Sequence, residues 1–335
     1  MEPITLRQLL EAVDGTLLGE FSDLDATFTA VDTDSRNIRP GSLFIPLQGE
    51  RFDGHAFLPA ALSAGAAGCL TARTRDSYEP GKFYVKVRST QRALRDLARW
   101  YKKQFDIPFV CITGSVGKTT TKDMVAAVLG EKFRVLKTEG NFNNNIGLPL
   151  TLLRLDREDE ICVLEMGMNH AGEIEYLSEI VEPDVALITN VGDSHIENLG
   201  SREGIFRAKC EIFSHMDPEK GFVILNGDDP LLSGLRPTLA FDTVSVGTAE
   251  GLEYRATDVS ADGEKSVCCH VTTPSTDFDA QIPALGSHML YPTLTATAVA
   301  EHFGMTCEEI ARGILRFAPT KMRMNILKRG NGITI

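Results

Sequence analysis

Residues 109–120 read FVCITGSVGKTT, and this stretch decides the fold. An apolar run typical of a buried strand leads into a glycine turn and then into residues that can open a helix. Glycines let backbone N–H groups turn inward around phosphate oxygens, while a helix N-terminus and a lysine add favourable charge. The longer motif G-x-x-x-x-G-K-[ST] is not met, because Ile112 stands five residues before Gly117. We nevertheless predict a phosphate-binding loop here rather than an ordinary Gly-Ser turn.

Two further apolar runs each lead to a residue that can bind a metal. ICVLEM (161–166) contains Glu165, and VALITNV (185–191) is followed by GDSH, which contains His195. Alternating strand and helix signals predict βαβ units with a mostly parallel sheet. Because ligands bind outside the carboxyl ends of such strands, we expect the glycine loop, Glu165 and His195 at one edge. Such a site suits Mg²⁺ beside a phosphate, with the Thr119 hydroxyl as a further ligand.

Each of these side chains also has a simpler interpretation when it is taken alone. A carboxylate at a strand end, such as Glu165, is more often a turn or cap residue than a metal ligand. A histidine near a loop, such as His195, is more often a surface or hydrogen-bonded structural residue. A helical lysine, such as Lys209 in REGIFRAKCEIF, is usually solvated. Both interpretations stay open for each single residue.

The segments on either side predict an α/β protein with two domains. Residues 28–87 alternate short strands and turns around one helix, which predicts a small α/β module. The sequence after Ser89 has helical periodicity, and residues 252–282 have the alternation of antiparallel strands. Thr5 and Thr306 each begin a capping box that opens a helix. The predicted domain limits are 1–84 and 85–318.

Composition excludes several classes of protein. The 335 residues are 43% hydrophobic and 24% charged, which is typical of a globular chain and not of a disordered one. A net charge of -12 argues against a sequence-independent grip on nucleic acid, so no such partner is expected. Seven cysteines without a C-x-x-C pair indicate a reducing compartment, and we expect a cytoplasmic protein. The uncharged run 56–72 is shorter than the ~20 residues that span a bilayer, so no membrane segment is expected.

Several longer segments carry a resemblance to a known family. TGSVGKTT (113–120), TEGNFNNNIGLPLTLLRL (138–155), the stretch 165–213 and NGDDP (226–230) resemble the Mur ligases and their folylpolyglutamate synthetase relatives. Mur ligases are ATP-dependent amide ligases that build the peptidoglycan stem peptide. EMGMNHAGEI at 165–174 is similar to the branch that adds D-alanyl-D-alanine to a UDP-N-acetylmuramoyl-tripeptide. The resemblance therefore implies those two substrates. We expect a monomer, although the sequence does not fix the oligomeric state.

Residue by residue, the resemblance implies ATP and Mg²⁺ as ligands. Lys118 would hold the β- and γ-phosphates, His195 would assist a second Mg²⁺, and Lys209 matches a lysine that family members carbamylate with CO₂. These three residues are the expected catalytic set. Implied ATP contacts are Gly114, Ser115, Val116, Gly117, Lys118, Thr119, Thr120, Asn144, Asn145 and Arg323. Implied metal ligands are Thr119, Glu165, His195 and Lys209, and implied UDP-substrate contacts are Ser35, Arg36, Asp53 and Gly54.

The chain departs from the family pattern in two places. Many relatives have H-N-x-x-N-A-L-A near residues 286–300, with an asparagine that contacts adenine, and here that position is Pro292. Family members also continue into a C-terminal Rossmann-like domain beyond the equivalent of residue 335. We therefore expect residues 319–335 to be a hinge and the start of an absent domain, and we expect the isolated chain to ligate slowly or not at all. The alternatives are another Mur ligase, a folylpolyglutamate synthetase-like ligase, or a nucleotide-binding protein that does not ligate.

Overall fold

The computed structural model describes residues 1–49, 52–262 and 266–319. The chain forms two compact units. Unit 1 contains Met1–Asp106 together with Glu139–Glu158, and unit 2 contains Ile107–Thr138 together with the described residues from Asp159 onward. Arg323 and the predicted hinge beyond residue 319 lie outside the described residues.

Unit 1 is built on a sheet with the strand order β2-β7-β6-β5-β4. Neighbours from β4 to β7 are parallel, β2 is an antiparallel edge strand, and β1 pairs separately with β3. The strands are β1 (Ile4–Thr5), β2 (Thr16–Leu18), β3 (Thr27–Phe28), β4 (Val31–Asp32), β5 (Leu43–Phe44), β6 (Gly68–Thr71) and β7 (Phe83–Lys86). The helices are α1 (Leu6–Ala12), α2 (Leu58–Ser63), α3 (Thr90–Lys102) and α5 (Gly147–Leu152).

Helix α2 covers this sheet through small and branched apolar side chains. Leu58, Ala61 and Leu62 pack with Phe44 and Tyr84 in one buried cluster. Both predicted capping boxes are confirmed, at the start of α1 and at the start of α11 (Cys307–Leu315). The helix predicted after Ser89 is α3, and the Ser89 hydroxyl accepts a hydrogen bond from a backbone N–H of its first turn.

Unit 2 contains a nine-stranded sheet in the order β16-β15-β14-β13-β12-β11-β8-β10-β9. The neighbours from β14 to β9 in this order are parallel, and β15 and β16 add antiparallel strands at the other edge. The predicted mostly parallel sheet and its antiparallel extension are confirmed. The strands are β8 (Phe109–Thr113), β9 (Val135–Lys137), β10 (Ile161–Glu165), β11 (Val185–Ile188), β12 (Phe222–Asn226), β13 (Asp242–Gly247), β14 (Tyr254–Asp262), β15 (Ser266–Thr272) and β16 (Asp277–Ile282).

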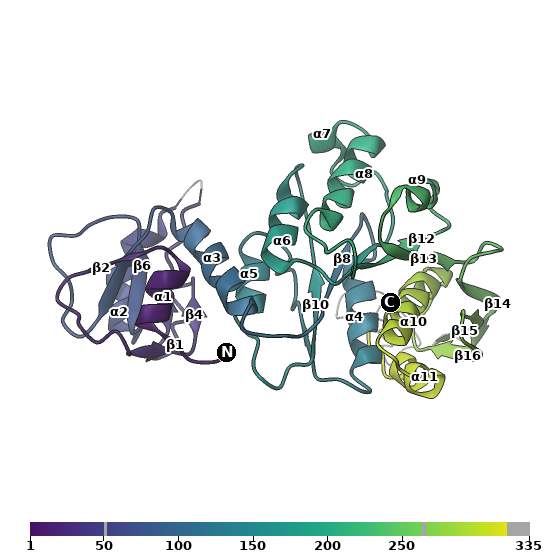
Figure 1. Cartoon of the computed structure of the whole chain (residues 1–335), viewed down its shortest axis with the longest axis horizontal. Helices are drawn as coiled ribbons and strands as arrows, with labels where there is room; N and C mark the ends of the chain where they lie inside the picture. The colour runs from purple at the N-terminus through teal and green to yellow at the C-terminus, as the bar shows by residue number, and fades with distance from the viewer. Residues whose placement is uncertain (50–51, 263–265, 320–335) are drawn as a thin grey trace, which may run out of the picture. The chain divides into compact units, whose positions relative to one another are not determined.

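Three helices share a single core with this sheet. Apolar side chains of α4, α10 and α11 form one buried cluster with those of the strands. Figure 1 shows α4, α10 and α11 beside one another in unit 2. The helices of unit 2 are α4 (Lys118–Leu129), α6 (Glu173–Val181), α7 (Ile196–Leu199), α8 (Arg202–Cys210), α9 (Pro230–Leu235), α10 (Leu290–His302) and α11 (Cys307–Leu315).

The compact units are divided differently from the predicted domains. Residues 85–106 and 139–158 group with unit 1, whereas the sequence places both segments in the second domain. The domain limits themselves stay a prediction.

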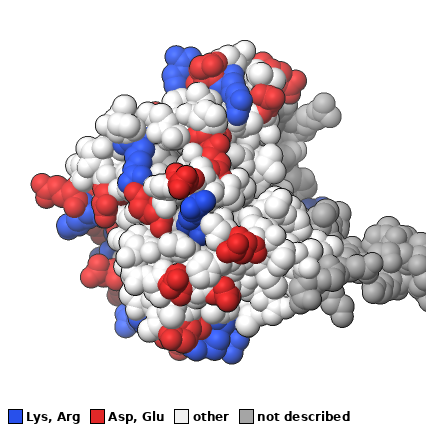
Figure 2. All heavy atoms as spheres, turned by 90° about the vertical axis from the view of Figure 1, so that its right-hand side faces the viewer, with Lys and Arg blue, Asp and Glu red and all other residues white. Residues whose placement is uncertain are grey.

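Cys111 and Cys162 are buried in β8 and β10 as free thiols, as expected for core residues. On the face of unit 2 that Figure 2 shows, acidic and basic side chains are interspersed. Within the described part of the chain, no helix is both long and apolar enough to cross a bilayer.

Candidate active site

The glycine loop, residues 114–117, is called the phosphate loop below. It joins the end of β8 to the start of α4 at Lys118. Strand β8 lies between β10 and β11, with Glu165 opposite Ile112 and Ile188 opposite Thr113. The carboxyl ends of all three strands therefore meet at one edge of the sheet, as the sequence predicts.

Two glycines give this loop its shape. Gly114 has φ of 151° and Gly117 has φ of 85°, a region of backbone space that side chains disfavour. A Cβ atom on Gly114 would lie 1.8 Å from the Thr189 Oγ1 atom, which leaves no room for a side chain. The loop therefore needs glycine both for its conformation and for its close approach to the segment after β11.

Lys118 and Lys209 are two lysines whose charges interact in this region. The Lys118 ammonium reaches back over the loop and donates to the Gly114 carbonyl oxygen at 2.8 Å. Lys209 lies on α8 and is only 1% exposed. Burial first, and then the positive charge of Lys118, lowers the pKa of the Lys209 ammonium to about 7. The simpler interpretation of Lys209 as a solvated helical lysine is wrong, because its side chain is buried.

Glu165 and Thr119 are the oxygen ligands that could hold a cation beside the loop. Both are buried, at 2% and 8% exposure. The Glu165 backbone N–H donates to the Thr138 Oγ1 atom at 3.0 Å, which fixes the end of β10. A hydroxyl and a carboxylate fit Mg²⁺, which usually keeps several waters and takes few protein ligands. Among the described residues, no three His, Cys, Asp or Glu side chains gather into a metal-binding group.

His195 precedes the short helix α7 and has φ of 67°, in the left-handed region. Non-glycine residues held in this conformation cluster at functional sites, although histidine tolerates it better than branched residues. His195 is exposed. Its predicted part in metal binding stays a prediction.

The predicted UDP contacts Ser35 and Arg36 follow β4 in unit 1. Arg36 makes an exposed ion pair with Asp34 at 2.7 Å. The hydrogen bonds from Arg36 lower the pKa of the Asp34 carboxyl to about 2. Beside them lies a cavity of about 270 Å³ in unit 1. It is lined by Val31, Asp32, Thr33, Asp34, Asn37, Arg39, Glu139, Phe142, Leu150, Thr151 and Arg154.

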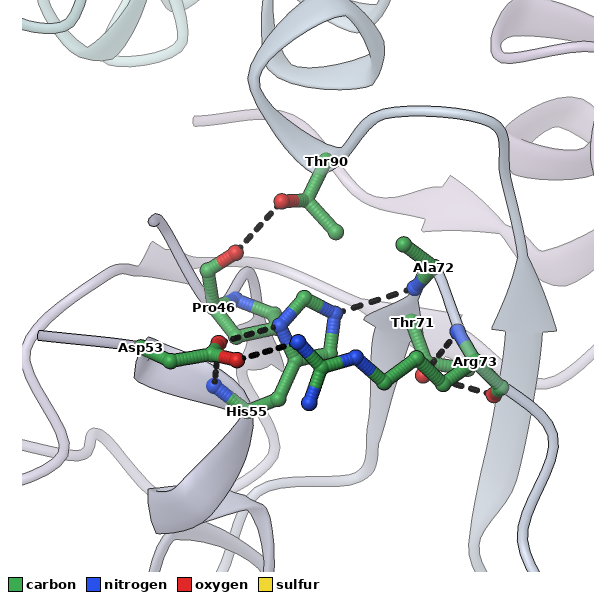
Figure 3. A network of polar contacts seen from close by, with 7 residues as sticks. All are labelled: Pro46, Asp53, His55, Thr71, Ala72, Arg73 and Thr90. Carbon is green, nitrogen blue, oxygen red and sulfur yellow. Dashed lines mark hydrogen bonds and ion pairs between the residues drawn. The ribbon is translucent and has the colours of Figure 1, made fainter. Parts of the chain in front are cut away.

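Asp53 belongs to a network of polar contacts inside unit 1 (Figure 3). Its Oδ1 atom accepts hydrogen bonds from the backbone N–H of His55 at 3.0 Å and from the His55 Nδ1 atom at 2.8 Å. Its Oδ2 atom accepts from Arg73 at 2.5 Å. The His55 Nε2 atom accepts from the Ala72 N–H at 3.0 Å, so the ring proton is on Nδ1. Hydrogen bonds from His55 lower the pKa of the Asp53 carboxyl.

Gly54 is buried against the chain that precedes it. A Cβ atom there would lie 2.6 Å from the Leu47 carbonyl oxygen. The structure thus places Asp53 and Gly54 in the scaffold of the loop 46–55, of which residues 46–49 and 52–55 are described. Their predicted contact with a UDP substrate stays a prediction.

Three other predicted nucleotide positions lie apart from the phosphate loop in the sequence. The Asn144 Oδ1 atom accepts hydrogen bonds from the Ile146 and Gly147 N–H groups at 3.1 and 2.9 Å, so it fixes the turn that leads into α5. Asn145 is exposed, and both asparagines belong to unit 1. Pro292 is buried in the first turn of α10 and has no backbone N–H to offer a base.

Sequence reasoning missed the two residues directly after β11. The Thr189 Oγ1 atom donates to the Val116 carbonyl oxygen at 2.6 Å, and Asn190 bonds both backbone groups of Val116. Only the pairing of β11 with β8 could have indicated them, because it brings the end of β11 beside the loop.

Comparison with known proteins identifies the family. The Mur ligase middle domain matches residues 112–300, and the Mur ligase family catalytic domain matches residues 27–102. The UDP-N-acetylmuramoyl-tripeptide--D-alanyl-D-alanine ligase of Bacillus subtilis (strain 168) is 41% identical over 99% of this chain and 71% of its own length. The chain belongs to the Mur ligase family. Members of this family are ATP-dependent amide ligases, so the resemblance seen in the sequence is confirmed.

Two solved structures of Mur ligases have the same fold as this chain and share at least 30% of its sequence. The crystal structure of MurF from Acinetobacter baumannii has a TM-score of 0.90 and 32% identity over 98% of this chain and 71% of that one. MurF ligase from Thermotoga maritima, solved in complex with ADP, has a TM-score of 0.81 and 30% identity over 90% of this chain and 69% of that one. The ADP in that Mur ligase supports ATP as the nucleotide that this family uses.

Proposed function

We propose that the chain is an ATP-dependent ligase that adds D-alanyl-D-alanine to UDP-N-acetylmuramoyl-tripeptide in peptidoglycan precursor synthesis. The observation that carries this proposal is a glycine loop at the sheet edge beside Glu165, in a chain 41% identical to a ligase of that name. The free cysteines and the need for ATP fit a reducing compartment, so the cytoplasm is the proposed location. We propose a monomer as the acting unit.

The reaction begins when the terminal carboxylate of the tripeptide attacks the γ-phosphorus of ATP. An acyl phosphate forms and ADP leaves. The amine of D-alanyl-D-alanine then attacks the acyl carbon, loses a proton, and displaces inorganic phosphate as the amide bond forms. This chemistry needs positioning and charge neutralisation more than a side-chain nucleophile. Lys118 would move its ammonium from the Gly114 carbonyl oxygen to the phosphate oxygens.

Mg²⁺ would be held by Thr119 and Glu165, and His195 and Lys209 are the further members of the proposed set. When bound, the cation neutralises charge on the phosphates and orients them for in-line attack. Glu165 suits this role because its strand β10 pairs with β8 on one side and with β9 on the other. Little conformational entropy of the backbone is therefore lost when a ligand binds.

Lys209 is proposed to be carbamylated on Nζ, which would turn a cation into a carboxylate-like ligand. Two features of the surroundings of Lys209 support this carbamylation. The side chain is enclosed on α8, and the charge of Lys118 acts on it. A buried ammonium facing another cation is unfavourable, whereas a carbamate there would be attracted to Lys118 and to a metal.

The UDP part of the acceptor is proposed to bind in unit 1, at the cavity beside Ser35 and Arg36. Two guanidinium groups line this cavity, Arg39 and Arg154, and Phe142 exposes 48% of its surface. Guanidinium groups suit diphosphate oxygens, and an exposed aromatic ring suits a base. Asp53 and Gly54 would support this binding indirectly, through the shape of the loop 46–55.

Product identity tests the proposal. The chain is incubated with Mg²⁺, ATP, D-alanyl-D-alanine, L-alanine, D-glutamate and a mixture of UDP-N-acetylmuramoyl acceptors, and products are identified by mass spectrometry. We expect a single product, the tripeptide acceptor extended by D-alanyl-D-alanine, even if it accumulates slowly. Extension of the dipeptide acceptor, or addition of a single amino acid, would show that the chain belongs to another step of the pathway.

A further inference from the structure

Asn190 holds the peptide group of Val116 from both sides. The Asn190 Nδ2 atom donates to the Val116 carbonyl oxygen at 2.9 Å, and the Val116 N–H donates to the Asn190 Oδ1 atom at 3.0 Å. Val116 is 66% exposed, so packing of its side chain does little to hold it in place. The position of this residue is therefore set through its backbone, by a side chain more than 70 positions away in sequence.

Four more hydrogen bonds join the phosphate loop to the segment 189–192, one of them from the Ser115 Oγ atom to the Gly192 carbonyl oxygen at 3.3 Å. The Ser115 N–H donates to the Asn190 carbonyl oxygen at 3.0 Å, and the Gly192 N–H donates to the Ser115 Oγ atom at 2.8 Å. The Thr189 Oγ1 atom donates to the Val116 carbonyl oxygen at 2.6 Å. Ser115 and Val116 are thus bound on backbone and side chain by one short stretch of chain.

The segment 189–192 is itself fixed on its far side. The Val191 N–H donates to the Asp229 Oδ2 atom at 2.8 Å, and the Arg202 Nε atom donates to the Val191 carbonyl oxygen at 2.9 Å. The Asn226 Nδ2 atom donates to the Thr189 carbonyl oxygen at 3.0 Å. Because β11 also pairs with β8, the support of the phosphate loop cannot shift without breaking the sheet edge.

We infer that Asn190 is a positioning residue for the phosphate loop, a role that rests on the proposed function. The Val116 N–H is occupied by Asn190, so it is not one of the groups that meet phosphate. Fixing that peptide sets the entry to Gly117 and to α4, whose first-turn N–H groups have no acceptors within the helix. Asn190 makes the loop rigid before nucleotide binds, and this lowers the ordering cost of binding.

Nucleotide binding to the full 335-residue chain tests the inference without requiring ligation. Isothermal titration measures ADP with Mg²⁺, and competition measures adenosine, which has no phosphate for the loop. Asn190→Ala removes two hydrogen bonds to Val116, so we expect ADP affinity to fall about tenfold. Adenosine affinity should change less than about twofold, since no phosphate is involved. Asn198→Ala, which removes an exposed asparagine eight positions along the chain, is the matched control and should bind both ligands normally.

Thr189→Val is a second and milder variant. It removes one hydrogen bond to Val116 and keeps the side-chain shape, so we expect an ADP affinity about two- to fivefold weaker. If a thermal melt shows that Asn190→Ala is not folded, Thr189→Val is used in its place to test the inference. Normal ADP affinity in the folded variants would overturn the inference alone. Equal losses for ADP and adenosine would also overturn it, since they indicate a general structural role. Absence of ADP binding by the unaltered chain would overturn the proposed function as well.

Discussion

Two loops of this protein, one in each unit, are held in opposite ways. The phosphate loop of unit 2 is held through its backbone by Thr189 and Asn190, and the Lys118 ammonium after it donates to the Gly114 carbonyl oxygen at 2.8 Å. The loop 46–55 of unit 1 is held by polar side chains of its own, Asp53 and His55, which bind Arg73 and Ala72 beyond β6. The phosphate loop is therefore held by side chains of a neighbouring segment, whereas the loop 46–55 is held by polar side chains of its own.

This difference shows when a polar side chain in a loop is available for chemistry. A carboxylate that accepts three hydrogen bonds from its own scaffold, as Asp53 does, has little capacity left for a ligand. A lysine that donates to a neutral carbonyl oxygen, as Lys118 does to Gly114, can exchange it for the charged oxygens of a phosphate. We therefore expect substitutions at Lys118 to affect activity, and substitutions in the loop 46–55 to affect stability first.

Lys118→Ala should give the largest effect on activity. Loss of the ammonium removes charge stabilisation of the transferring phosphate, so ATP turnover should fall by at least about 100-fold. The free energy of unfolding should change by no more than about 1 kcal/mol, because the Lys118 side chain is only partly buried. ATP turnover and urea unfolding check the two halves of this prediction, with Lys220→Ala as an exposed control. Turnover close to that of the unaltered chain would refute the assignment of the loop.

Lys209→Ala should also reduce activity strongly, and in a way that can be reversed. If Nζ carries a carbamate, a small carboxylic acid can enter the space left by the side chain and replace the ligand. We expect ATP turnover to fall by about 100-fold and to recover in part with formate or acetate. Lys220→Ala should show neither loss nor rescue. Full activity of the Lys209 variant without added acid would contradict carbamylation.

Gly54→Ala should be the most destabilising single substitution in the loop 46–55. The new Cβ atom would lie 2.6 Å from one Leu47 backbone atom and 2.8 Å from another, so the loop must shift. Overpacking of this kind costs about 2–3 kcal/mol in the free energy of unfolding. Gly81→Ala is the matched control, since open space surrounds it and only its φ of 74° resists a side chain, at about 1 kcal/mol. Equal losses for the two variants would show that the loop tolerates the contact.

His55→Gln should give a smaller loss of stability. The ring is buried and links the Asp53 carboxylate to the Ala72 N–H, and a glutamine cannot make both contacts with the same geometry. We expect the free energy of unfolding to fall by about 1–2 kcal/mol in urea, with little change in ADP affinity. A large loss of ADP affinity with normal stability would break the distinction between the two loops.

The sequence predicted the backbone of unit 2 well, because apolar strands, glycines and parallel order constrain it jointly. The phosphate loop, the strand end at Glu165 and the antiparallel extension follow from residue patterns of short range. The grouping of residues 139–158 with unit 1 did not follow, because it depends on contacts between segments distant in sequence. Asn190 was missed for the same reason, since its partner Val116 lies on another strand-to-helix connection.

The burial of Lys209 also could not be read from the sequence. REGIFRAKCEIF has the composition of a partly exposed helix, and only the packed structure shows that this lysine is enclosed while its neighbour Arg207 is exposed. Asp53 shows the reverse case. Its motif indicated a ligand contact, whereas the folded chain uses its oxygens for His55 and Arg73.

The proposed function requires this chain to recognise a UDP-N-acetylmuramoyl-tripeptide. Isothermal titration of the chain with that compound and with the corresponding UDP-N-acetylmuramoyl-dipeptide measures this recognition, because binding needs no turnover. We expect the tripeptide to bind at least about tenfold more tightly than the dipeptide. Tighter binding of the dipeptide, or no binding of either compound, would contradict the proposed function.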